Sequence, residues 1–363
     1  MKLAAIVTPY LPSEVSGGVE RFNYYLENFL CRNGYEVHYY HSGTIKQDKL
    51  NNLRYINSVV KPLRTGKQIK NIKDYSLVIS NGNYGIGIKR KKGVKYINFH
   101  HGTSMGLADA VSSKYSWKSF LINKYLTLGP SEFLSGMKMS RVAVGQCVRD
   151  ELRRYFNSDS YLLCNAVDTK HFKKLLSASS DTIEAKTEEA KRELNCLFIS
   201  RYDRYLKGFD FLEKLIEKLE GVRWTIIISG SHSLKKRWNT DIYENINYFD
   251  LPAYYSRADV AFYLSRYEGN SYYLLEALCS ELPVIATPAG EAKHIYKCEE
   301  LDGLLIKTSI DEAEAFDEVK SIVEYLRDKS VRDKAGRASR RIIENSYSMQ
   351  RWETELKEIL SKI

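Results

Sequence analysis

The first residues whose spacing suggests chemistry are two acids, Glu268 and Glu276, in the segment 265–291, SRYEGNSYYLLEALCSELPVIATPAGE. The pattern predicts a strand, a loop, a helix and a strand, with Ser271 as the helix N-cap and Glu276 inside the helix. The acids stand too far apart for a side-by-side pair, but each can accept hydroxyl groups of one elongated ligand. A structurally paired, buried Glu276 is the alternative; we disfavour it because its apolar neighbours offer no cation.

Two loops elsewhere have residues that suit phosphate. Arg201 directly follows a predicted strand, and Lys207 and Gly208 precede a predicted helix, so a guanidinium and an ammonium would converge on a diphosphate. Gly17 and Gly18 open the first predicted helix, where bare amides and the helix dipole favour an anion. An ordinary basic loop and a tight turn are the alternatives. The loop of Gly17 and Gly18 matches neither a dinucleotide fingerprint nor a Walker loop, which disfavours nicotinamide enzymes and P-loop NTPases.

A histidine pair, His100 and His101, lies where a predicted strand ends, in INFHHGTS. Site residues of open α/β sheets usually lie at such strand ends. Side chains alternate along a strand, so we expect one ring to point into the sheet and the other toward a cleft. A purely structural histidine is the alternative.

The elements that must position these residues alternate between short β-rich runs and helical patterns in both halves of the chain. This alternation implies α/β architecture with parallel sheets covered on both faces. The predicted strands are KLAAIVTPY, YEVHYYHSG, YSLVISNG, KYINFHHG, SRVAVG and SYLLCNAV in the first half, and LNCLFIS, WTIIISG, VAFYLS, LPVIATP and GLLIKT in the second.

Composition and charge narrow the class of protein. The chain has 363 residues, of which 44% are hydrophobic and 28% charged, as expected for a folded two-domain protein. Six cysteines show no metal-ligand spacing, no apolar run is long enough for a membrane span, and the N-terminus reads as a strand, so we expect a cytoplasmic protein. The net charge is +10; residues 1–165 carry 24 Lys+Arg against 11 Asp+Glu, or +13, which suits a polyanionic partner.

Taken together, these motifs resemble the retaining GT-B glycosyltransferases of family 4, in the family's order and over nearly the whole chain. The glycine-rich first loop is similar to Gly17-Gly18, and the strand-end histidine to His101. VRDEL (148–152) and NAVDTKHF (165–172) look like two further family elements, and the basic pair and the Glu-x7-Glu motif match the residues described above. The family's Glu-Gly-Phe-Gly reads Glu268-Gly269-Asn270-Ser271 here, so we expect Asn270 and Ser271 to influence the choice of sugar.

The resemblance implies a GT-B fold: two Rossmann-like α/β/α domains facing across a cleft, with a C-terminal helix crossing back. It implies an acceptor-binding domain over 1–170 plus 348–363 and a nucleotide-sugar-binding domain over 171–347. It implies transfer of a hexosyl group from a UDP- or GDP-linked sugar to a glycan or lipid-linked cell-surface acceptor. No metal or other cofactor is expected. The implied catalytic residues are His101, Arg201, Lys207 and Glu268; the implied donor-binding residues are Gly17, Gly18, Arg201, Lys207, Glu268, Asn270, Ser271, Tyr272 and Glu276.

Two other functions stay open. A catalytically inactive glycosyltransferase-like subunit would keep the same motifs, and a nucleic-acid-binding protein would rest on the basic first half alone, without a recognised base-stacking module. A subsidiary hypothesis is peripheral contact with the inner face of an anionic membrane through Ser112–Leu126, SSKYSWKSFLINKYL, which mixes aromatic and aliphatic residues with lysines. An ordinary packing helix is the competing interpretation.

Overall fold

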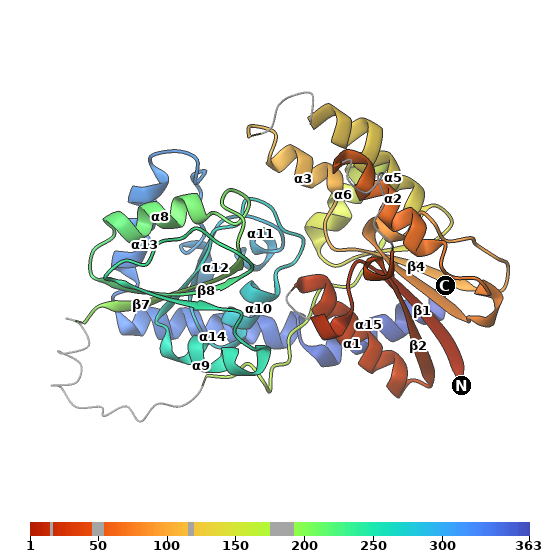
Figure 1. Ribbon diagram of the computed structural model, residues 1–363. Helices are drawn as coiled ribbons and strands as arrows, with labels where there is room; N and C mark the ends of the chain where they lie inside the picture. The colour runs from red at the N-terminus through yellow and green to blue at the C-terminus, as the bar shows by residue number, and fades with distance from the viewer. Residues whose placement is uncertain (15–16, 46–53, 115–119, 175–191) are drawn as a thin grey trace. The chain divides into compact units, whose positions relative to one another are not determined.

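The computed structural model describes residues 1–14, 17–45, 54–114, 120–174 and 192–363. Contacts divide the chain into two units, Met1–Asn165 with Glu353–Ile363, and Ala166–Trp352 (Figure 1). The predicted domain bounds lay at 170 and 348. The difference arises because Val167 joins the second unit: its N–H donates to Tyr347 O over 2.9 Å, and it bridges Ser348.

The first unit contains a parallel sheet with the strand order β2-β1-β3-β4-β5-β6 among the described residues. Its central strands are continuously buried, as in other parallel sheets that are covered on both faces. The strands are β1 (Lys2–Thr8), β2 (Tyr35–His41), β3 (Leu77–Asn81), β4 (Lys95–His100), β5 (Ser140–Ala143) and β6 (Tyr161–Leu162); the helices are α1 (Gly18–Arg32), α2 (Arg54–Gly66), α3 (Ser104–Ala110), the π-helix η6 (Ile122–Thr127), α5 (Leu128–Gly136) and α6 (Gln146–Phe156).

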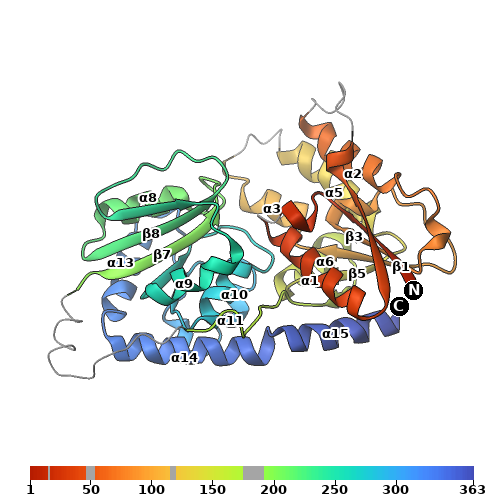
Figure 2. The same cartoon turned by 60° about the horizontal axis from the view of Figure 1, so that its bottom comes forward.

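Helices cover both faces of this first sheet. α1 and the C-terminal helix α15 (Met349–Lys362) lie on one face, and α2 and α5 lie on the other (Figure 2). α15 packs beside α1: Arg32 Nη2 donates to Glu353 Oε1 over 2.6 Å, and Lys357 lies over the Phe29 ring. From Glu353 onward, the last helix therefore belongs to the first unit, as expected for a helix that crosses back.

The second unit contains a parallel sheet with the order β11-β10-β7-β8-β9. α8 covers one face, and α9 and α10 cover the other (Figures 1 and 2). The strands are β7 (Leu194–Arg201), β8 (Val222–Ser229), β9 (Thr240–Glu244), β10 (Val260–Tyr263) and β11 (Val284–Ala286); the helices are α8 (Phe209–Lys218), α9 (Leu251–Arg257), α10 (Tyr272–Cys279), α11 (Ala292–Ile295), α12 (Glu299–Asp302), α13 (Ala315–Tyr325) and α14 (Lys329–Ser346).

Three strand assignments differ from the sequence prediction. The run 160–167 forms only the two-residue β6, and 303–308 makes a single bridge, Ala286 to Leu305, in place of a strand. β9 was not predicted, because it is a half-exposed edge strand without an apolar run. None of these differences moves the strand ends that carry the candidate site.

Candidate functional site

In the second unit, the site residues lie at the carboxyl ends of two neighbouring strands. Arg201 is the last residue of β7, and Glu268 follows β10, which pairs directly with β7. Lys207 comes from the β7–α8 loop, and its Nζ forms an ion pair with Glu268 Oε1. The structure therefore brings together two residues that were singled out in separate motifs. Parallel strands meet at one edge, which is where ligands of open α/β sheets bind.

A third residue, Arg266, holds these two loops together. Its guanidinium donates to Asp210 over 2.8 and 3.0 Å, and it donates to Asp311 as well, with the shortest of those bonds 2.7 Å from Nη2 to Oδ1. It also stacks on the Tyr205 ring at 4.0 Å, and its backbone N–H donates to Leu206 O over 2.9 Å. Arg266 precedes Glu268 by two positions and also holds the loop that carries Lys207. It therefore fixes the distance between the Glu268 carboxylate and the Lys207 ammonium.

The environment of Lys207 destabilises its protonated form. Burial, together with the nearby Arg201 guanidinium, lowers the pKa of Lys207 to about 8. Arg201 itself is exposed. The pair therefore presents one exposed and one desolvated cation at the end of β7, an arrangement that suits a ligand with two negative charges.

Two glycines allow the loops to approach each other closely. Gly208, the residue before α8, has a φ of +73°, and a Cβ there would lie 2.2 Å from Leu264 O. Gly290 has a φ of +60°, and a Cβ there would lie 2.8 Å from Glu268 O. Both positions combine a left-handed backbone with a contact that a side chain would break. The loop that carries Glu268 is therefore packed between two glycines.

Of the two acids in the Glu-x7-Glu motif, Glu268 and Glu276, Glu276 is the more buried. It lies in α10 with 2% of its surface exposed, and Tyr255 OH on α9 donates to its Oε2 over 2.9 Å. The reason for disfavouring a structural role, the lack of a nearby cation, overlooked a neutral partner from another helix. Asn270 and Tyr272 are also buried, whereas Ser271, the N-cap of α10, is half-buried and makes no side-chain capping bond.

The glycine-rich loop in the first unit already has a carboxylate beside it. Gly17 is the N-cap of α1, and a Cβ there would lie 2.3 Å from Glu20 Oε2. Gly18 is exposed. An acid at the third helical position is favoured by the helix dipole, so α1 has its own stabilising anion at this end. Binding of a phosphate at Gly17 and Gly18 stays a prediction that requires Glu20 to move aside.

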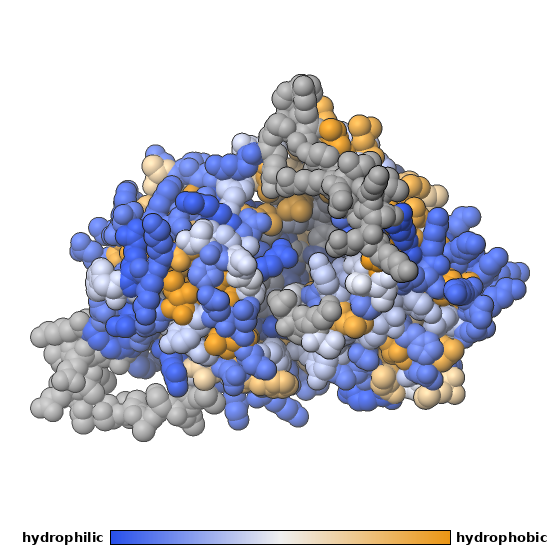
Figure 3. Space-filling view, viewed as in Figure 1, coloured by the Kyte–Doolittle hydropathy of each residue, from blue (hydrophilic) through white to orange (hydrophobic). Residues whose placement is uncertain are grey.

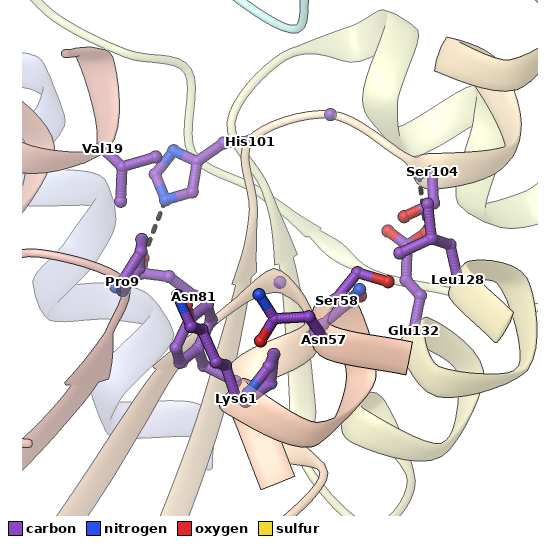
Figure 4. Close-up of a pocket in the computed structure, with 15 residues that line it drawn as sticks. Pro9, Val19, Asn57, Ser58, Lys61, Asn81, His101, Ser104, Leu128 and Glu132 are labelled. Carbon is purple, nitrogen blue, oxygen red and sulfur yellow. Dashed lines mark hydrogen bonds between the residues drawn. The ribbon is translucent and has the colours of Figure 1, made fainter. Parts of the chain in front are cut away.

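The two histidines separate as their alternation along β4 predicts. His100 is fully buried, with Nδ1 3.3 Å from Glu132 Oε1, while His101 lines a pocket of 480 Å³ (Figure 4). The His101 ring packs edge-on against Phe22. Burial, with a smaller effect of His100, lowers the pKa of His101 to about 3, so the ring is neutral at physiological pH.

A buried polar chain behind His101 fixes its tautomer. His101 Nε2 lies 2.8 Å from Asn81 Oδ1, Asn81 Nδ2 donates to Asn23 Oδ1 over 3.0 Å, and Asn23 Nδ2 donates to Thr8 Oγ1 over 2.8 Å. Since Asn81 Oδ1 can only accept, the ring proton lies on Nε2. His101 therefore offers Nδ1 as a hydrogen-bond acceptor.

Comparison with known proteins bears directly on this architecture. The chain superposes on sucrose-phosphate synthase from Thermosynechococcus elongatus with a TM-score of 0.76 and 15% identity, covering 100% of this chain and 99% of that one. WaaG, a glycosyltransferase involved in lipopolysaccharide biosynthesis, gives 0.66 and 13% over 98% and 99%, and Anabaena Alr3699/HepE in complex with UDP-glucose gives 0.65 and 13% over 99% and 100%. The fold is GT-B. The GT-B expectation from sequence is thereby confirmed.

The sequence comparisons concern less of the GT-B chain. Residues 179–342 match the family model described as glycosyl transferases group 1. A Klebsiella pneumoniae relative described as an uncharacterized 41.2 kDa protein in cps region is 28% identical over 145 residues, 38% of this chain and 37% of the relative's length. Together, the family match and the GT-B neighbours support a group 1 glycosyltransferase.

Sequence reasoning missed several residues of this GT-B site. Arg266 lies in the same loop as Glu268, and Tyr255 reaches Glu276 from α9; Asn81 and Lys61 share the pocket with His101. Asn81 ends strand β3, so its position resembles that of His101 and could have drawn attention. Lys61 stood only within a basic run, where nothing distinguished it from the exposed lysines around it.

Proposed function

We propose that this chain is a retaining, metal-independent hexosyltransferase of family 4. Its donor would be a UDP- or GDP-linked sugar bound by the second unit, and its acceptor a glycan or lipid-linked saccharide of the cell surface bound by the first. The observation that carries the proposal is the half-buried ion pair of Lys207 and Glu268, beside Arg201, at the adjoining ends of β7 and β10. UDP and UDP-glucose are bound by a structural neighbour of the same fold, Alr3699/HepE.

In the proposed reaction, the acceptor oxygen attacks the anomeric carbon on the face from which the diphosphate leaves. The bond from that carbon to the diphosphate oxygen breaks, and the acceptor hydroxyl proton passes to a diphosphate oxygen. Arg201 and Lys207 neutralise the charge that grows on the leaving diphosphate, the kind of electrostatic stabilisation that lowers such barriers most. Glu268 would hold the transferred sugar, and Glu276 would hold the ribose. His101 Nδ1 would accept a hydrogen bond from a sugar hydroxyl group.

The pairing of Lys207 with Glu268 sets the order of events in this proposal. With no donor bound, each side chain satisfies the other, and neither is left as a buried, uncompensated charge. A diphosphate would replace Glu268 as the partner of Lys207, which frees the Glu268 carboxylate for the sugar hydroxyls. Donor binding thereby prepares the acid for its own role.

Nucleoside diphosphate release from a panel of UDP- and GDP-sugars, with candidate acceptors, tests the proposal. Lys207→Ala and Glu268→Ala should abolish most release, whereas Lys214→Ala, which removes an exposed lysine of α8, should not. Unchanged turnover in the first two variants would refute the site assignment. A wild-type chain that binds UDP or GDP yet turns over no donor would instead identify an inactive relative.

We extend the proposal to contact with an anionic membrane through the first unit. Large hydrophobic side chains reach the surface around η6 and α5 (Figure 3); they are Leu121, Tyr125, Leu126, Phe133, Leu134 and Met137. Lys138, also exposed, follows the last of them. A mixed apolar and basic surface of this kind favours anionic lipid headgroups. Part of the predicted segment, 115–119, lies outside the described residues. In the part of the chain that is described, no helix is long and apolar enough to cross a bilayer.

Cosedimentation with vesicles of anionic phospholipid at low salt tests this contact. The double variant Leu126→Ser, Leu134→Ser should lose binding, and Tyr325→Ser, which removes an equally exposed ring from the second unit, should retain it. Absence of wild-type binding at low salt would rule the contact out.

A further inference from the structure

The pocket in the first unit that contains His101 has a lining suited to a particular ligand. It lies at the carboxyl ends of β1, β3 and β4 and measures 480 Å³, within the usual range for small-molecule sites. Asn57, Ser58 and Lys61 come from α2, and His101 and Ser104 from the segment after β4 (Figure 4). Apolar groups, among them Val19, Pro62 and Leu128, complete the walls. Amides and hydroxyls over apolar surface suit a sugar ring, which has both kinds of surface.

The charges in this pocket do not cancel. Glu132 is 2% exposed, and both of its oxygens are engaged: Oε1 faces His100 Nδ1 and Oε2 accepts from Ser104 N over 2.7 Å. The ring of His101 is neutral. Lys61 is half-buried and has no ionic or hydrogen-bonding partner for its ammonium among the described side chains. The ligand therefore meets one positive charge and no negative charge that is free to oppose it.

A second polar atom in the pocket also has no partner. The Asn57 side-chain oxygen is buried and accepts no hydrogen bond from the described residues. A buried acceptor without a donor costs free energy that a ligand hydroxyl would recover. Asn57 lies one helical turn before Lys61, and side chains four apart share a helix face. An unmatched acceptor and an unmatched cation therefore lie side by side on α2.

We infer that this pocket is the acceptor subsite and that it binds a hydroxylated glycosyl group bearing an acidic substituent, a carboxylate or a phosphate. Lys61 pairs with the acidic group, Asn57 Oδ1 accepts a hydrogen bond from one hydroxyl group, and His101 Nδ1 accepts a hydrogen bond from another. The inference rests on the proposed function only in calling the ligand an acceptor. The binding itself can be measured without turnover. It narrows the acceptor from any glycan to an anionic one.

The test measures binding of three small probes, D-glucuronate, glucose 1-phosphate and glucose, to the full chain by ligand-observed NMR titration. Wild type should bind the two anionic sugars more tightly than glucose. Lys61→Met should lose about tenfold in affinity for the anionic sugars, the effect of one charge-assisted hydrogen bond, and bind glucose as before. Lys61→Arg should retain most of the affinity. Lys67→Met removes an exposed lysine just beyond α2 and serves as the matched control.

A preference between the two anionic probes assigns the acidic group as carboxylate or phosphate. Equal affinity of wild type for glucose and the anionic sugars, no binding of any probe, or equal effects of Lys61→Met and Lys67→Met would overturn the inference. Binding of UDP and GDP to the same samples separates this result from the proposed function. A Lys61→Met chain that is folded and binds nucleotide, yet shows no change for the anionic sugars, refutes the subsite alone.

Discussion

The two candidate sites handle charge in opposite ways. At the ends of β7 and β10 in the second unit, the cation Lys207 and the acid Glu268 are paired, and Arg266 is shared between two aspartates. In the pocket of the first unit, a neutral histidine is held by a chain of amides, and Lys61 stands without an ionic partner among the described residues. A site for a highly charged leaving group needs cations that are already held in place without the ligand, whereas a site for a sugar with one acidic substituent needs fixed, neutral hydrogen-bonding groups and a single unpaired cation.

The largest effect should follow from removing the paired cation. Lys207→Met should reduce nucleoside diphosphate release by roughly 10²–10³-fold, the usual loss when one electrostatic contact to developing charge is removed. Steady-state kinetics with the best donor measures it. Arg32→Met, which breaks the ion pair between Arg32 of α1 and Glu353 of α15, is the control. A Lys207→Met rate within a few-fold of wild type would contradict the assigned role.

Arg266→Met should have the next largest effect, because it separates the two loops without touching the proposed donor residues. We expect a loss of roughly 2 kcal/mol in the free energy of unfolding, since the aspartate partners are partly exposed. We also expect kcat to fall more than KM rises. Arg266→Lys keeps the charge without the bidentate geometry, and its rate should lie between those of the wild type and Arg266→Met. Urea unfolding together with kinetics distinguishes positioning from a loss of stability alone.

Donor affinity should weaken at alkaline pH. Because the pKa of Lys207 is lowered to about 8, the ammonium loses its proton above that pH, and a diphosphate then loses one of its two cations. The dissociation constant of the preferred nucleoside diphosphate should therefore rise by about tenfold per pH unit once the pH is well above 8. Calorimetric titrations from pH 7 to pH 10 measure this slope. Lys207→Arg, whose guanidinium stays charged, should remove it.

Acid sensitivity of the folded chain should arise from His101. Its pKa in the folded chain is about 3 and its usual value is 6.5, so between these values the unfolded chain binds the proton more readily. The free energy of unfolding should fall as the pH drops through this window. His101→Gln, which can still donate to Asn81, should give a shallower decline in urea unfolding at pH 7, 5.5 and 4.5. An identical decline would show that other groups dominate.

The sequence predicted the fold better than it predicted the surroundings of each site residue. Strand ends and helix starts follow from local patterns, so Arg201, His101 and Ser271 were placed correctly at the edges of elements. Partners that arrive from distant segments leave no local pattern. Tyr255 reaches Glu276 from another helix. Lys61 differs from its basic neighbours only because its position on α2 places its side chain in a pocket.

The central claim is that the second unit binds the nucleotide and the first unit binds the acidic sugar. Measuring nucleotide and sugar affinities of the wild type, Lys207→Met and Lys61→Met tests this claim most directly. UDP and GDP binding should fall by at least about tenfold in Lys207→Met and stay at the wild-type value in Lys61→Met, while glucuronate binding shows the reverse. Loss of nucleotide binding in Lys61→Met, or its persistence in Lys207→Met, would contradict the account.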